Sequence, residues 1–141
     1  MISAFPLTAA RMPRSVASVE FAAHARRVLR EHGRYAANVA DLPPLAFTRV
    51  QVATLRAHFG AVCVLADPGL LRGRRYGNAV LAAAPTAGGL PIRRLTRLAA
   101  REPFPARVVH GPDLEAFVAG AQPVADAAAV DSPPPPPQLI V

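Results

Sequence analysis

Two polar side chains mark the end of an expected strand at residues 34–40, within the stretch REHGRYAANVADLPPLAFTR. Asn38 lies late in that strand, and Asp41 follows it just before Pro43-Pro44. Ligands of α/β proteins bind at the carboxyl ends of strands, where a carboxylate can hold a cationic amine and an amide can bond to the pocket. The alternatives are a helix-capping turn residue for Asp41 and a polar group beside a turn for Asn38.

The other reactive side chains favour structural roles. Cys63 is the single cysteine, so it cannot form a disulfide within the chain, and its apolar run AVCVLAD predicts a buried thiol, not a nucleophile. Asp67 precedes Pro68-Gly69, which predicts a turn. The four histidines have no metal-ligand spacing, so no metal site is expected.

The chain is strongly basic, with a formal net charge of +7, and all sixteen of its basic residues are arginine. Arginine without lysine is typical of a GC-rich coding sequence, so we expect an arginine-coated surface and not a dedicated nucleic-acid surface. The basic loop LLRGRR has no interleaved aromatic residue that would stack on bases. A solvated loop is therefore favoured there over a site for phosphate or acidic partners.

The apolar segments are short. None approaches the roughly 18 residues of a membrane span, and in MISAFPLTAARMPR the arginines follow the apolar stretch, the reverse of a signal peptide. We expect a cytoplasmic protein without a membrane partner; a transit peptide is the less favoured alternative.

Hydrophobic periodicity predicts alternating helices and strands. The expected order is a strand stub at 1–5, helix 15–30, strand 34–40, helix 48–59, strand 61–66, strand 76–84, helix 91–101, then a short strand and a helix within 106–120. Ser15 or Ser18 can cap the first helix and Gly33 can end it, while Thr48 and Gln51 have capping-box spacing. Residues 121–141 are rich in alanine and proline, which predicts a disordered tail after a domain at 1–120.

The connection between the strands at 61–66 and 76–84 is too short for a helical crossover. These strands must therefore be antiparallel neighbours. We expect the spatial order 35–40, 76–84, 61–66, with the middle strand antiparallel to both others. An α/β sheet that finishes on a reversed strand resembles the second half of the class I methyltransferase fold, whose strand order at this end is 4-5-7-6.

Several segments also resemble spermidine synthase-like proteins of GC-rich bacteria. They are Ala4-Phe5, Pro13, Glu20-Phe21, residues 28–33, the hairpin LADPGLLRGRRYGNAVLAAA and residues 102–111. The resemblance covers residues 4–126, and it implies the carboxyl-terminal half of a truncated Rossmann-like domain.

The resemblance also implies a site and a chemistry. The family transfers an aminopropyl group from decarboxylated S-adenosylmethionine to an amine, and its methyltransferase relatives use S-adenosylmethionine. By the resemblance Asn38, Asp41 and Tyr76 bind substrate, and Ser3 stands where the family has its catalytic acid. The family's glycine-rich loop and ribose-binding acid have no counterpart here, so we expect this chain alone to bind no adenosyl cofactor.

Two functions follow as hypotheses. The first is a spermidine synthase-like transferase whose small amine substrate is held by carboxylates. The second is an inactive remnant or truncated product that acts through protein contacts. A strand edge left by the truncation would also favour a homo-oligomer, or marginal stability.

Overall fold

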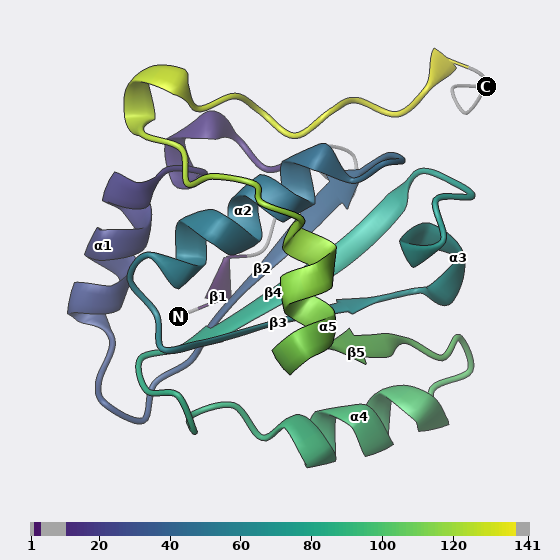
Figure 1. The fold of residues 1–141 in the computed structure, drawn as a ribbon, viewed down its shortest axis with the longest axis horizontal. Helices are drawn as coiled ribbons and strands as arrows, with labels where there is room; N and C mark the ends of the chain where they lie inside the picture. The colour runs from purple at the N-terminus through teal and green to yellow at the C-terminus, as the bar shows by residue number, and fades with distance from the viewer. Residues whose placement is uncertain (1, 4–10, 138–141) are drawn as a thin grey trace.

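The computed structural model describes residues 2–3 and 11–137, and all statements about the fold refer to these residues. Its elements, coloured along the chain in Figure 1, are β1 (Ile2–Ser3), the 3-10 turn η2 (Arg14–Val16), α1 (Val19–Val28), β2 (Tyr35–Asp41), α2 (Ala46–Arg56), β3 (Ala61–Ala66), α3 (Pro68–Leu71), β4 (Gly77–Ala84), α4 (Ile92–Arg101), β5 (Arg107–Val109), α5 (Gly111–Val118) and the 3-10 turn η3 (Asp126–Ala128).

The strands form one sheet in the order β1-β2-β4-β3-β5. β1 runs parallel to β2, whereas β4 is antiparallel to both β2 and β3. The predicted order of the three central strands and the reversal of the middle one are therefore confirmed. β5 adds an antiparallel partner on the outer side of β3, a pairing that sequence reasoning did not anticipate.

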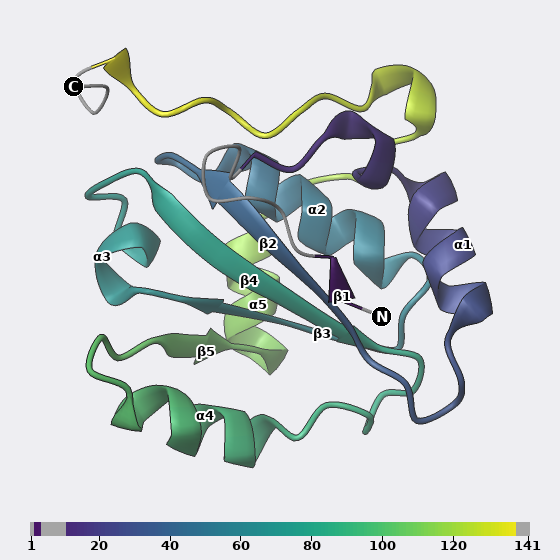
Figure 2. The ribbon, with the colours of Figure 1, turned by 180° about the vertical axis from the view of Figure 1, so that it is seen from behind.

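The helices divide between the two faces of the sheet. Side chains of α1, α2 and α5 pack with Tyr35, Val39 and Leu81 into the larger core. On the opposite face α4 packs its Ala99 with Cys63 and Val108 in a smaller core. The division follows the alternation of side chains along a strand. In Figure 2, seen from behind, no helix lies in front of β2 and β4.

The helix ends agree only in part with the capping residues that the sequence predicted. Ser18 caps α1, since its side chain accepts from the Phe21 amide at 3.2 Å. α1 ends at Val28, before the expected end, because Leu29 is extended, and Gly33 closes a separate turn by donating to the Arg30 carbonyl. The capping box expected of Thr48 and Gln51 does not form, because both residues lie inside α2 and bond to other segments.

Residues 121–137 do not behave as the disordered tail that their composition predicts. They run back over α2 toward residues 11–20, as both ribbon views show. Ser132 is fully buried; its amide donates to the Met12 carbonyl, and its hydroxyl accepts from the Met12 amide. We call residues 124–133 the strap. Disorder was predicted because this segment was expected to have no packing partner, but the strap contacts the segment before α1. Residues 138–141 lie outside the described residues.

The described part of the chain lacks two features. None of its helices is long and apolar enough to cross a membrane. Nor does it gather three or more histidine, cysteine, aspartate or glutamate side chains in a position to hold a metal ion.

Candidate functional site at the carboxyl end of β2

Asp41 is the last residue of β2 and is almost fully buried, with 2% of its surface exposed. One carboxylate oxygen accepts from the Leu42 amide at 2.8 Å. The other accepts from the Thr48 amide at 2.8 Å and from the Thr48 hydroxyl at 2.6 Å. Asp41 thus closes the first turn of α2, the capping role that the sequence left open as an alternative, and its charge is fixed at this edge of the sheet.

Asn38 lies on the other face of the sheet. Residues at even positions of β2 alternate with Tyr35, Ala37 and Val39, which face the larger core. Asn38 is half-buried and pairs across the ladder with Val80, which is 39% exposed. The structure therefore does not bring Asn38 and Asp41 into one pocket. The signal was present in the sequence, because their separation of three residues places them on opposite faces of a strand.

Tyr76 stands just before β4 and close to Asp41, because Gly77 is the register partner of Asp41. The Tyr76 hydroxyl donates to the Pro133 carbonyl at 3.3 Å. Partial burial raises the pKa of Tyr76; the charge of Asp41 adds to the increase and that of Arg11 opposes it. Tyr76 therefore joins the carboxyl end of β2 to the strap.

Ser3 pairs with Ala37 in the parallel ladder of β1 and β2. Ala37 precedes Asp41 by four residues of β2, so the backbone of Ser3 lies beside the middle of β2 and not at the edge where Asp41 lies. Its side chain and residues 4–10 lie outside the described residues.

A groove of about 580 Å³ lies beside this edge, between the β2–α2 connection, the first turns of α2 and the strap. Its lining consists of Asp41, Leu42, Pro43, Pro44, Ala46, Phe47, Val50, Gln51, Val124, Ala128, Val130, Asp131 and Pro133. Sequence reasoning found Asp41 but missed Asp131 and Val130, because their segment carries no periodic pattern and is placed by contacts with residues far away in the chain.

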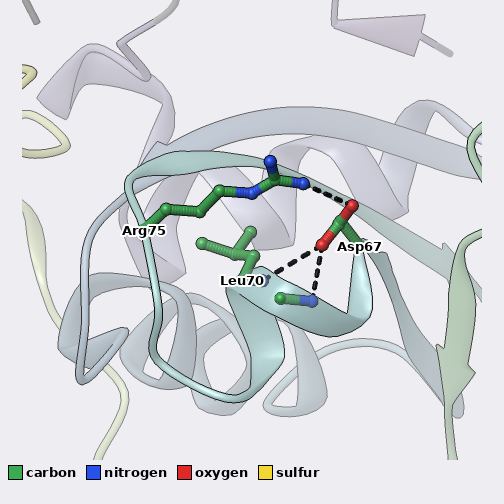
Figure 3. A network of polar contacts seen from close by, with 4 residues as sticks. Asp67, Leu70 and Arg75 are labelled. Carbon is green, nitrogen blue, oxygen red and sulfur yellow. Dashed lines mark hydrogen bonds and ion pairs between the residues drawn. The ribbon is translucent and has the colours of Figure 1, made fainter.

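Asp67 lies outside this groove and has a structural role. As Figure 3 shows, its carboxylate accepts from the amides of Gly69 at 2.5 Å and Leu70 at 3.3 Å and pairs with Arg75 at 2.5 Å. Desolvation alone would raise the pKa of Asp67, but these two hydrogen bonds and the Arg75 charge together lower it. The predicted turn is thus a capped helical turn, α3.

Cys63 lies in the smaller core, as the apolar run around it predicts. Burial raises the pKa of its thiol to about 11. A thiol in this state is protonated at neutral pH and is a poor nucleophile.

The fold and this edge define a class of protein. In this sheet β1 and β2 are parallel, and β4 is reversed between β2 and β3. Polar residues gather at the carboxyl end of β2. This is a Rossmann-like α/β arrangement of the methyltransferase kind.

A solved structure gives this class a closer relative. The chain matches a probable spermidine synthase from Corynebacterium glutamicum ATCC 13032, with a TM-score of 0.73 and 31% sequence identity. The match covers 87% of this chain and 46% of that chain, so this chain spans less than half of its relative's length. No protein-family model and no curated protein matches the sequence. This match confirms the resemblance to spermidine synthases that the sequence predicted.

Proposed function

We propose that this chain forms the amine-binding side of a spermidine synthase-like transferase. The observation that carries the proposal is the 31% identity over 87% of the chain to a probable spermidine synthase. The reaction is transfer of an aminopropyl group from decarboxylated S-adenosylmethionine to an amine. The amine nitrogen forms the new C–N bond and loses a proton, while the C–S bond breaks and the sulfonium becomes a thioether.

The fixed charge of Asp41 supports the amine side of this proposal. Its carboxylate is held at the carboxyl end of β2 by Thr48 and Leu42. A buried anion at this edge stabilises a nearby cation through its field without direct contact. Asp41 is therefore assigned a positioning role.

The described residues do not fit an adenosyl group. β2 is followed by Leu42-Pro43-Pro44, and β3 by Asp67-Pro68-Gly69, and neither is a glycine-rich turn. A Cβ on Gly69 would lie 2.8 Å from an Asp67 carboxylate oxygen, so this glycine serves the α3 cap. We therefore assign no cofactor contact to this chain. The same observation favours the second candidate, a remnant that acts through protein contacts.

The test compares the chain alone with the longest protein that its genomic locus encodes in the same frame. Each is incubated with decarboxylated S-adenosylmethionine and an amine, and aminopropylated product is measured by mass spectrometry. We expect transfer by the longer protein and none by the chain alone. Absence of transfer in both would favour the remnant.

Calorimetric titration of the chain alone with S-adenosylmethionine and its decarboxylated form completes the test. We expect no submicromolar affinity for either compound, because orientation in such a pocket depends on polar contacts that the described residues lack. Submicromolar affinity would contradict this assignment and point to a pocket completed by a second copy.

A further inference from the structure

Helix α4 concentrates positive charge on one surface of the molecule. Four of its ten residues are arginines, namely Arg93, Arg94, Arg97 and Arg101. All four are exposed, and none takes part in an ion pair within the described residues. Glu102 supplies the one carboxylate of residues 91–107, and on the adjoining β5 Arg107 pairs with Asp113 at 3.3 Å. The charge of α4 is therefore not balanced by its surroundings.

Most of these arginines do not stabilise their own helix. Arg93 and Arg94 lie in the first turn, where positive charge opposes the helix dipole. Pro91 precedes the helix without a side-chain cap, and the first turn contains no acidic residue. Arg101 alone lies in the last turn, where positive charge is favourable. An anionic partner would relieve the unfavourable charge at the start of α4.

Three of the arginines form one row along the helix, which we call the arginine row: Arg93, Arg97 and Arg101. They are four residues apart, which places them on one side of α4 at intervals of about 6 Å. On the other side Ala99 is buried in the smaller core, against which Ile92 and Leu95 pack. The arginine row therefore faces solvent and not the sheet.

Two apolar side chains are exposed close to the arginine row. Leu98 is 45% exposed, and Phe104, in the loop after α4, is 89% exposed. Pro103 and Pro105 flank Phe104 and restrict the backbone that presents it. Arginine together with aromatic and aliphatic side chains is the composition found at the centre of protein–protein interfaces.

A helix that carries carboxylates fits these features. Acidic residues repeated every fourth position of an α-helix have the same spacing as the arginine row, and the same helix can present apolar residues to Leu98 and Phe104. A lipid surface fits less well, because the apolar side of α4 is already packed in the smaller core. A nucleic acid fits less well too, since it would leave Leu98 uncovered and find a single phenylalanine on which to stack.

We propose that α4 and Phe104 form a docking surface for an acidic amphipathic helix of a partner protein. The carboxylates of that helix pair with the arginine row, and its apolar residues cover Leu98 and Phe104. Both ribbon views place α4 and the strap at opposite rims of the molecule. The docking surface is therefore separate from the candidate site, and it does not depend on the proposed function.

The test is the binding of a fluorescent synthetic helical peptide in which glutamate and leucine each recur every fourth residue, measured by anisotropy at pH 7. The comparisons are a peptide of the same composition with its glutamates out of register, a single-stranded oligonucleotide and vesicles of anionic lipid. We expect the regular peptide to bind most tightly, and its affinity to fall with added salt. Equal or tighter binding of any comparison, or no binding of the regular peptide up to about 1 mM, would overturn the proposal.

Two triple variants locate the charged part of the surface. The first replaces the arginine row with Arg93→Gln, Arg97→Gln and Arg101→Gln, and it should weaken binding of the regular peptide about threefold to thirtyfold. The matched control removes the same charge at exposed positions elsewhere, with Arg30→Gln, Arg72→Gln and Arg74→Gln. It should change the affinity less than about twofold, because distant exposed charges are screened. Circular dichroism checks that both variants fold, and equal effects of the two would overturn the proposal.

Phe104 tests the apolar part of the surface. Phe104→Ser should weaken binding of the regular peptide by up to about tenfold, because the leucines of the peptide lose an apolar contact. The variant is expected to fold, since the side chain is exposed. Val130→Ser, at an exposed apolar position on the strap, is the control and should leave the affinity unchanged. Wild-type affinity of Phe104→Ser would overturn the assignment of Phe104 to the docking surface.

Discussion

At the scale of single residues, Asp41 shows how a candidate ligand side chain becomes a structural one. Its carboxylate accepts from the Thr48 amide and hydroxyl inside the protein. We predict that Asp41→Ala lowers the free energy of unfolding by about 2–3 kcal/mol, because buried donors lose a charged acceptor. Urea denaturation followed by circular dichroism measures the change. Glu102→Ala, at an exposed position, serves as control, and equal stability of the two variants would contradict the prediction.

Cys63 gives a second prediction at this scale. Its pKa is raised from 9.0 to about 11, so at pH 8 the thiolate is about a hundredfold rarer than in an exposed cysteine. We predict negligible reaction with iodoacetamide at pH 8 in the native state and full reaction in denaturant. Because the folded-state pKa is the higher one, the associated stability is complete below pH 9 and is lost as the pH rises toward 11. Rapid native labelling would show that β3 opens readily.

At the scale of elements, α3 depends on one ionised side chain. The pKa of Asp67 is lowered in the folded state. Its contribution to stability is therefore present above the unfolded-state pKa and is lost as the pH falls through the folded-state value. We predict that Asp67→Asn reduces stability at pH 7 and flattens the loss of stability on acidification. Urea midpoints at several pH values between 7 and 3 test this, and parallel curves for wild type and variant would contradict it.

The strap gives a second prediction at the scale of elements. The Ser132 hydroxyl accepts from the amide of Met12, a residue with 1% of its surface exposed. Ser132→Ala should lower the free energy of unfolding by about 1–3 kcal/mol, because that buried amide loses its acceptor. Ser15→Ala, at an exposed position in η2, should have little effect. If Ser132→Ala were neutral in thermal and urea unfolding, the strap would not be a stabilising element.

At the scale of the whole molecule, both edges of the sheet are formed by short strands. β1 has two residues and β5 has three. Among the described residues, β1 pairs with β2 at Ala36 and Ala37 alone. An unpaired strand edge can pair with another chain, so we propose that the chain self-associates or is marginally stable. Light scattering coupled to size exclusion, with thermal unfolding, tests this. A dilute sample that remains monomeric and melts cooperatively at a mesophilic temperature would contradict it.

The sequence by itself determined the local elements and the reversal of β4. The reason is that the ten residues between β3 and β4 cannot span the sheet with a helical crossover, a constraint that involves no distant residue. Strand alternation also determined that Asn38 and Asp41 face opposite sides, although the prediction of a shared pocket overlooked it. Local rules held for the Ser18 cap and for strand alternation. They failed for the capping box of Thr48 and Gln51, whose side chains bond to Asp41 and Ala17 instead.

The tertiary structure decided the roles of Asp41, Asp131 and Ser132. Asp41 became a buried cap because α2 begins where Thr48 can reach its carboxylate. The strap has no periodic pattern of its own, and it is ordered by hydrogen bonds to Arg11 and Met12, about 120 residues away in the chain. The groove exists only because this segment returns to α2, so its mostly apolar lining depends on a long-range contact that composition does not specify.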